Sequence, residues 1–425
     1  MTDWIGAAEA AERLGIKQAS LYAYVSRGVL SRRREADTRT SMFDADEVDE
    51  LARKGRPRRP AGPAELVIES ALTEITPSTQ RYRGHDATHL AVTRSFEDVA
   101  MLLWTGSLPT GRQSVPLDSP APGWQATADA LSAGGAAQAA LPDGTLPLER
   151  LQVIVPALAA TDQFRLHLDQ PAVVAAGRAL IAGMAGALPD SGDGSGSLGS
   201  GSLGSGPLET KAGNSVAARL ARKLCRGPVP DRFTDVLNAA LVLVADHELA
   251  ASTLAARVAA SMRADPYAVV ATGLGAMGGA LHGGAALGAE LMLGAASSPA
   301  DAPRVVGDLL RRGERLPGFG HFVYKDGDPR ANLMLQLLAD FAPDSPQLAI
   351  ASEVTAEARR RALPEPNIEF ALAVLAGVAG MIRGAGEAIF ATGRTAGWLA
   401  HALEEYERNV PIRPRGVYTG QTTAI

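Results

Sequence analysis

The stretch Pro317-Gly-Phe-Gly-His-Phe-Val-Tyr-Lys325, followed closely by Asp328-Pro-Arg330, is the most informative part of this 425-residue sequence. Glycines precede His321, and a histidine whose neighbours lack side chains is open to a ligand and is a poor core filler. Arg330 follows a proline turn, where a guanidinium group can bind a carboxylate through two hydrogen bonds. A structural role would explain His321 or Arg330 taken alone. A functional interpretation therefore depends on whether similar residues occur elsewhere in the chain.

Two further histidines and two further arginines stand in similar surroundings. The histidines are His247 in Ala245-Asp-His-Glu248 and His282 in Gly279-Ala-Leu-His-Gly-Gly-Ala285. The arginines are Arg394 in Gly393-Arg-Thr-Ala-Gly-Trp398 and Arg413 in Ile412-Arg-Pro-Arg415. No H-E-x-x-H motif is present, and the single cysteine, Cys225, forms neither an internal disulfide nor a Cys-based zinc site. We therefore expect no metal.

In motif, order and spacing, these segments resemble the citrate synthase family, over about residues 61 to 425. The landmarks that carry the resemblance are Ala245-Asp-His-Glu248, Ala280-Leu-His-Gly-Gly284, Gly318-Phe-Gly-His321, Asp328-Pro-Arg330, Arg394-Thr-Ala-Gly-Trp398 and Arg413-Pro-Arg-Gly-Val-Tyr-Thr-Gly420.

The resemblance implies a role for each of these residues. It implies that oxaloacetate is bound by His247, Arg330, Arg394 and Arg413, with Arg413 reaching across a homodimer interface into the partner's site. It implies that His282 donates a hydrogen bond to the thioester carbonyl of acetyl-CoA and that His321 polarises the ketone of oxaloacetate. Lys325 matches a basic position near the CoA phosphates, although a solvated lysine explains it equally well. Acetyl-CoA is then a substrate, and no tightly bound cofactor is implied.

Two positions depart from the family pattern. Asn367-Ile-Glu-Phe370 places Glu369 where the family has an aspartate as the base. A glutamate has a similar intrinsic pKa, about 4.3 against about 3.9, but its extra methylene moves the carboxylate, and a misplacement of about 1 Å can cost about a hundredfold in rate. Phe322 follows His321 where relatives often carry a small or basic residue, which affects substrate choice or CoA contacts.

The segment Gly273-Leu-Gly-Ala-Met-Gly278 matches the G-x-G-x-x-G pattern of dinucleotide-binding loops. Such a loop needs a strand before it and a βαβ unit around it. Here Asp265 and Pro266 are typical of a helix start, and no acidic-ended strand follows. We interpret the glycines as allowing close approach of helices or a ligand.

The amino-terminal segment has the spacing of a helix-turn-helix of the MerR or excisionase type. Helices are expected at Ala7–Leu14, Gln18–Ser26 and Asp46–Ala52. The resemblance assigns to DNA contact the residues Tyr22, Tyr24, Ser26, Arg27, Arg32, Arg33 and Arg34, the last three on a wing. Residues 1–60 hold 12 Lys and Arg against 10 Asp and Glu, a weak basic excess. A packing or oligomerisation module with solvated arginines is the alternative.

The rest of the chain is rich in Ala, Leu, Glu and Arg at helical spacing, so the fold class is mainly α. We expect a two-domain helical fold of the citrate synthase type after the small amino-terminal domain. Helices are expected at 157–168, 172–188, 215–224, 233–244, 250–263, 302–312, 331–342, 353–361 and 368–382. The domain bounds are 1–55 for the helix-turn-helix, 56–64 for a basic linker, 65–283 and 379–425 for a large domain with a Gly/Ser loop at 190–206, and 284–378 for a small domain.

The composition indicates a cytoplasmic protein without membrane spans. Hydrophobic residues make up 46% of the chain, charged residues 20%, and no apolar run approaches the ~18 residues of a span. Three functions stay open at this point. The first is condensation of acetyl-CoA with oxaloacetate to citrate, the second is 2-methylcitrate synthesis from propionyl-CoA, and the third is a DNA-binding regulator whose degenerate synthase domain senses oxaloacetate or an acyl-CoA.

Overall fold

The computed structural model describes residues 4–14, 16, 18, 21, 24–25, 30–34, 40–53, 68–109, 123–191, 215–280 and 282–420. The chain forms two compact units, Met1–Glu69 and Ser70–Ile425. The basic linker expected at residues 56–64 and most of the Gly/Ser loop lie outside the described residues.

The first unit is a three-stranded antiparallel sheet with helices packed on it. Strand β1 (Trp4–Gly6) and strand β2 (Arg32–Arg34) both pair with the central strand β3 (Ser41–Asp44). Helices α1 (Ala7–Arg13) and α3 (Ala45–Arg53) confirm two of the expected helices within one or two residues. Its small core consists of Ile5, Ala10, Ala11, Leu21, Leu30, Phe43, Ala45 and Val48.

The second unit is almost wholly helical, which confirms the mainly α class. Its helices are α4 (Ala87–Thr93), α5 (Phe96–Thr105), α6 (Ala128–Ala139), α7 (Pro147–Ala159), α8 (Gln170–Ala187), α9 (Val216–Leu224), α10 (Phe233–Val244), α11 (Ala251–Ser261), α12 (Pro266–Met277), α13 (Gly284–Gly294), α14 (Ala302–Arg311), α15 (Pro329–Phe341), α16 (Pro346–Arg360), α17 (Ile368–Val378) and α18 (Ala385–Arg408). A short antiparallel sheet of β4 (Thr73–Ile75), β5 (Gln80–Tyr82) and β6 (His85–Asp86) precedes them.

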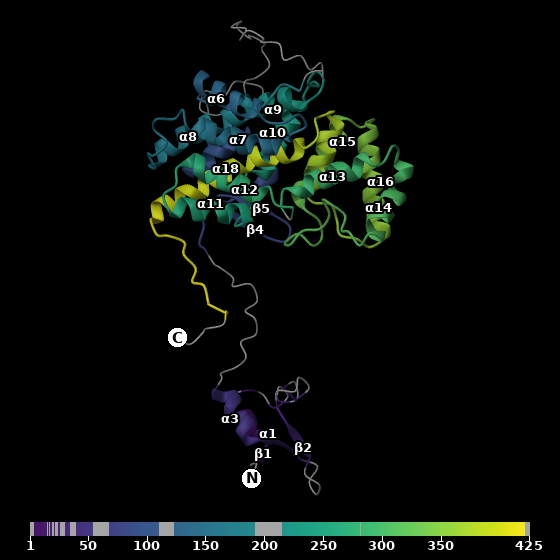
Figure 1. Ribbon diagram of the computed structural model, residues 1–425. Coiled ribbons are helices and arrows are strands. Elements are labelled where there is room, and N and C mark those ends of the chain that lie inside the picture. The colour runs from purple at the N-terminus through teal and green to yellow at the C-terminus, as the bar shows by residue number, and fades with distance from the viewer. Residues whose placement is uncertain are drawn as a thin grey trace. The chain divides into compact units, whose positions relative to one another are not determined.

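Helix α18 crosses the body of this unit (Figure 1) and contacts α5, α7, α8, α10, α11, α12, α13 and α17. Glycines allow the closest of these contacts. A Cβ atom at Gly393 would lie 2.6 Å from Cγ2 of Val244, and one at Gly397 would lie 2.5 Å from the carbonyl oxygen of Ala245. The backbone amide of Gly397 donates to that carbonyl oxygen. The end of α10, and with it the segment that carries His247, is therefore fixed against α18.

Most expected helices of the second unit are present, but three differ. The helix expected at 157–168 does not form, because α7 ends at Ala159 and α8 begins only after Asp169. The side chain of Asp169 caps α8 by accepting from the amide of Ala172. Helix α16 begins at Pro346 rather than 353 because proline suits its first position. Helix α17 ends at Val378 rather than 382, ahead of Gly380, whose φ of +60° is outside the helical region.

The G-x-G-x-x-G segment lies in and directly after α12, which Asp265 caps, so it is not a dinucleotide loop. The close-packing interpretation is confirmed at Gly273, where a Cβ atom would lie 2.6 Å from Cδ2 of Trp398 in α18. Among the described residues, no helix has the length and apolar character that crossing a membrane requires.

Candidate functional site

The loop that carries His321 is tied to the start of α17. The amide of Asn367 donates to the carbonyl oxygen of Gly318, and the amide of Gly320 donates to that of Glu365, at 2.8 Å each. Gly318 has a φ of +77°, and a Cβ there would lie 2.8 Å from Cβ of Phe370. A larger residue is therefore excluded at Gly318, and His321 and Glu369 are held in one locality.

The ring of His321 has a defined tautomer. Its Nδ1 atom accepts hydrogen bonds from the backbone amides of Val323 (3.0 Å) and Tyr324 (3.2 Å). The proton of the neutral ring is therefore on Nε2. Burial lowers the pKa of His321 to about 4, and Arg330 adds to this shift. At neutral pH the ring is an uncharged donor, the form suited to polarise a carbonyl oxygen.

Arg330 is held by the residue two positions before it. Asp328 caps α15 and accepts from Nε (2.9 Å) and Nη2 (2.7 Å) of Arg330, and the amide of Ile368 also donates to Asp328 at 3.1 Å. Although burial opposes it, the Asp328 carboxylate raises the pKa of Arg330 above its ordinary value. The remaining nitrogen, Nη1, has no hydrogen bond among the described residues and is left for an anionic ligand.

His282 lies in the turn between α12 and α13 and is held by α11. Its Nε2 atom lies 2.7 Å from Oγ of Ser252, and Nε1 of Trp398 donates to the same hydroxyl oxygen at 3.4 Å. Trp398 leaves the hydroxyl proton of Ser252 available for His282, and a neutral ring that accepts this proton at Nε2 carries its own proton on Nδ1. Burial lowers the pKa of His282 to about 4, so this ring is also a neutral donor.

His247 follows α10, and its ring faces the loop that carries His321 and Tyr324. Its ring meets the ring of His321 edge to face, with centroids 5.1 Å apart, and that of Tyr324 at 5.7 Å. Its Nε2 atom is buried and has no partner among the described residues. Burial, with added repulsion from Arg330 and Arg394, lowers the pKa of His247 well below its ordinary value. A ligand oxygen would satisfy this buried nitrogen.

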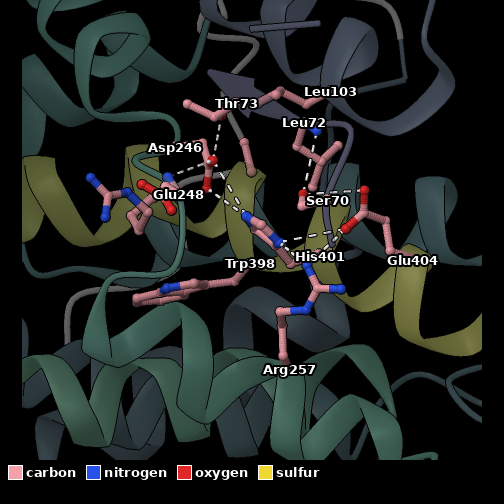
Figure 2. A network of polar contacts seen from close by, with 12 residues as sticks. Ser70, Leu72, Thr73, Leu103, Asp246, Glu248, Arg257, Trp398, His401 and Glu404 are labelled. Carbon is pink, nitrogen blue, oxygen red and sulfur yellow. Dashed lines mark hydrogen bonds and ion pairs between the residues drawn. The ribbon is translucent and has the colours of Figure 1, made fainter. Parts of the chain in front are cut away.

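A buried polar network holds the residue next to His247. In Figure 2, His401 lies between Asp246 and Arg257. Nη1 of Arg257 donates to Nδ1 of His401 at 2.7 Å, and Nε2 of His401 lies 3.4 Å from Oδ2 of Asp246. Glu405 accepts from Nε of Arg257 at 2.6 Å, and the four side chains are at most 1% exposed.

Arg394 projects from α18 and is 1% exposed. Its Nε–H donates to the carbonyl oxygen of Val244 at 2.7 Å, and its guanidinium carbon lies 4.5 Å from the centre of the Phe390 ring. Its two terminal nitrogens have no hydrogen bond among the described residues. Burial lowers the pKa of Arg394 below its ordinary value, and a bound carboxylate would stabilise its charge.

Glu369 and His282 line the same pocket. The pocket is small and is formed by Met277, His282, Gly283, Ala286, Glu369, Glu387 and Phe390. Oε2 of Glu369 is buried and unpaired among the described residues. Burial raises the pKa of Glu369, an effect that Arg330 partly offsets. A buried carboxylate of raised pKa beside a neutral donor is the arrangement that general-base catalysis requires.

An open groove adjoins His321 on its other side. Its lining includes Arg315, Phe322, Lys325 and Pro364. Nζ of Lys325 donates to the carbonyl oxygen of His321 at 3.0 Å and is otherwise exposed. The ring of Phe322 is 90% exposed. The groove offers cationic groups and an aromatic face to a ligand.

Arg413 has no hydrogen bond or ion pair with this site among the described residues, and the residues expected to contact DNA belong to the first unit. Arg413 is exposed on the segment after α18, where the amide of Ile412 donates to Oγ of Ser261 at 3.0 Å. In the first unit, Arg32, Arg33 and Arg34 lie on β2, and the guanidinium carbon of Arg33 lies 4.6 Å from the centre of the Trp4 ring. Tyr24 is helical and partly buried, whereas Tyr22, Ser26 and Arg27 lie outside the described residues.

Four residues of the site belong to none of the motifs quoted above: Ser252, Arg257, His401 and Glu387. Arg257 is the one charged residue of α11, which is a sequence signal, whereas His401 lies among several charged residues of α18 and has none. Within the described residues no group of three or more His, Cys, Asp or Glu side chains is arranged to bind a metal ion.

A family model described as citrate synthase, C-terminal domain, matches residues 64–415. The chain belongs to the citrate synthase family. It is therefore a condensing enzyme of the acyltransferase type. The match leaves out the first 63 residues, and nothing in it shows a helix-turn-helix.

The relatives of this citrate synthase family member include two activities. It is 33% identical over 381 residues to the citrate synthase of Haloferax volcanii, covering 84% of this chain and 94% of that protein. It is 31% identical over 395 residues to the 2-methylcitrate synthase of Mycobacterium tuberculosis, covering 91% and 95%. A solved structure of citrate synthase from Thermoplasma acidophilum, in a ternary complex with carboxymethyl-CoA and oxaloacetate, is 25% identical with a TM-score of 0.67, covering 85% of this chain and 96% of that one.

Proposed function

We propose that this chain condenses acetyl-CoA with oxaloacetate and water to give citrate and CoA. The observation that carries the proposal is that neutral His282 shares a pocket with the buried carboxylate of Glu369, while the loop with neutral His321 is hydrogen-bonded to the start of the helix that carries Glu369. The tautomer of His321 is set by two backbone amides, and Ser252, by donating to Nε2 of His282, would leave the proton of that ring on Nδ1. Condensation needs this combination, because a base must take a proton while two oxygens gain negative charge.

Oxaloacetate binds first to the cationic side of the site. Arg330 and Arg394 bind its carboxylates, and the unpaired Nε2 of His247 supplies a further polar contact. His321 donates its Nε2 proton to the ketone oxygen. Since Arg330 is already paired with Asp328, Arg394 provides most of the uncompensated positive charge that the dianion neutralises.

The carbon–carbon bond then forms in two steps. Glu369 removes a proton from the acetyl methyl group, while Nδ1–H of His282 stabilises the enol oxygen that develops on the thioester. The enol carbon attacks the ketone carbon, and His321 stabilises the alkoxide. Water then cleaves the thioester of citryl-CoA, which gives citrate and CoA. The groove with Lys325, Arg315 and Phe322 holds the CoA portion.

The domain motion and the dimer are part of the same proposal. Helices α13 to α17, in the segment 284–378 expected to be the small domain, carry His321, Arg330 and Glu369, whereas His247, His282 and Arg394 belong to the segments expected to be the large domain. Closure of one on the other would exclude water from the enol. Arg413 is exposed and, in the described part of the chain, has no hydrogen bond or ion pair with a residue of its own site, which supports a role in a partner's site of a homodimer.

A second proposal concerns the first unit, which we infer binds DNA through its helices and its arginine-bearing strand. The pairing of β2 with β3 places Arg32–Arg34 on the edge strand of a small sheet, the form that a wing takes. The test is binding of a random duplex of about 25 base pairs by the full chain over a salt series. Affinity that falls as salt rises supports the proposal, and absence of binding at low salt contradicts it.

The enzymatic proposal is tested by following free CoA thiol and citrate together. Acetyl-CoA with oxaloacetate should yield both products in equal amounts, and omission of oxaloacetate should abolish the release. Propionyl-CoA as the better substrate would favour 2-methylcitrate synthesis. Binding of oxaloacetate without any thiol release would favour the regulator.

A further inference from the structure

Glu387 is a buried carboxyl group for which the reaction described above has no use. It lies in the first turn of α18, is 4% exposed, and lines the same small pocket as His282 and Glu369. The other walls of that pocket are apolar groups of Met277, Ala286 and Phe390. The carboxyl group of Glu387 is therefore a third polar group, beside His282 and Glu369, in the lining of a space whose remaining walls are apolar.

The position of Glu387 on α18 shows which end of the site it faces. Residues 387, 390 and 394 share one face of the helix because they are three and four positions apart. Phe390 contacts the ring of His282 edge to face, with centroids 6.1 Å apart, and it contacts Arg394 on its other side. Seven residues of helix rise about 10 Å, so Glu387 lies about that far from the arginine that binds oxaloacetate. It faces the acyl end of the site.

No cation balances this carboxyl group. The structure gives Glu387 no hydrogen bond to any described residue, and its charged neighbours are two further acids, Glu290 and Glu149. Burial, reinforced by these two carboxylates, raises the pKa of Glu387 to about 7. Glu387 is thus a polar side chain with little access to solvent and no hydrogen-bond partner among the described residues, and burying such a group lowers the stability of the fold.

We propose that Glu387 selects the acyl group of the thioester, closing the acyl pocket so that acetyl-CoA is accepted and propionyl-CoA is disfavoured. The inference rests on the proposed function, since the pocket receives an acyl group only if the chain binds acyl-CoA. In this pocket, the methyl group of an acetyl thioester would not reach the carboxyl group of Glu387. The additional methyl group of propionyl-CoA would press against it, taking away its remaining solvent without offering a hydrogen bond.

The experiment compares four full-length proteins: wild type, E387A, E387Q and E407A. Glu407 is an exposed residue of the same helix, so E407A is the matched control for loss of a glutamate. The ratio of kcat/KM for propionyl-CoA to that for acetyl-CoA is measured at saturating oxaloacetate. E387A removes an unpaired buried acid from beside Glu290, so we expect it to fold and to melt no lower than wild type.

Wild type should prefer acetyl-CoA, and E387A should raise the ratio about tenfold or more, since one methylene in a pocket discriminates by roughly 10- to 200-fold. E387Q keeps the volume and polarity of the side chain, so its ratio should stay within twofold of wild type, as should that of E407A. A ratio in E387A within twofold of wild type overturns the inference, and so does a wild type that prefers propionyl-CoA. If wild type releases no CoA, the proposed function fails, and the same ratio is then taken from dissociation constants of the two thioesters measured by calorimetry.

Discussion

The ring of His247 stands edge to face against the ring of His321, with centroids 5.1 Å apart and planes at 77°. The two histidines are 74 residues apart in the chain, one following α10 and the other preceding α15. Such a contact is compatible with neutral rings, whereas two protonated rings at this distance would repel each other. Both have lowered pKa values, chiefly because of burial. The site is therefore built for uncharged histidines.

Folding stability should fall as the pH is lowered from about 6.5 to about 4. The unfolded chain binds a proton at each histidine near its ordinary pKa of about 6.5, whereas folded His282 and His321 do so only near 4. In that window the unfolded state binds more protons, so stability rises with pH. Urea unfolding at several pH values measures this, and H321N should lose less stability on acidification than wild type. Equal losses in the two proteins would show that His321 is not held neutral.

Oγ of Ser252 lies 2.7 Å from Nε2 of His282 and would hold the ring proton on Nδ1 by donating there. S252A should therefore reduce kcat by about tenfold to a hundredfold, less than the ~10² to 10³ expected for losing a donor outright. The KM for oxaloacetate should change little, because Ser252 contacts no residue assigned to that substrate. Steady-state kinetics of CoA release provide the measurement. The control is T272A on α12, which removes an exposed hydroxyl that bonds only to its own helix. An unchanged kcat in S252A would mean that the tautomer is set by another group.

Arg257 balances Glu404 and Glu405 in the network beside His247. R257M should lower the free energy of unfolding by about 3–5 kcal/mol, because it leaves a buried charge without its partner. It should also weaken oxaloacetate binding, since Asp246 and His247 share one loop. R304A, which removes an exposed arginine with two acidic partners, should change stability by less than about 1 kcal/mol. Denaturant unfolding and calorimetry measure the two effects, and equal stability losses in both variants would contradict this account.

Gly397 is the point at which α18 meets the end of α10. G397A places a Cβ atom against Asp246 and 2.5 Å from the carbonyl oxygen of Ala245, and overpacking of this kind costs about 1–3 kcal/mol. G275A, at an exposed helix position with no atom within 4 Å of the added Cβ, should instead stabilise by about 0.5–1 kcal/mol, because alanine favours the helix over glycine. Thermal unfolding of both variants gives the comparison. A G397A protein as stable as wild type would show that α18 can shift away from α10.

The histidines, the arginines and the carboxylate that act on the substrates could be identified from the sequence, but the residues that position them could not. His282, His321 and Arg330 were identifiable because glycine or proline beside them marks a ligand-accessible turn. His247, Arg394 and Glu369 were identifiable because their order and spacing match a family. Ser252, Arg257 and His401 were not, since each is an ordinary helix residue until the crossing of α11 and α18 is known. Glu387 could not be identified either, because an acid in the first turn of a helix is explained by its favourable interaction with the helix dipole. Helix ends were missed where a single capping residue decides them, as at Asp169 and Pro346.

The central claim is that Glu369 is the base of an oxaloacetate-dependent condensation. The most direct test is CoA thiol release by wild type and by E369Q, with oxaloacetate binding to both measured by calorimetry. Wild type should release CoA only with oxaloacetate, and E369Q should bind oxaloacetate with an affinity within a few fold of wild type while losing at least ~10² of the rate, the lower range for general-base catalysis. E369Q turning over at a rate close to that of wild type would contradict the claim.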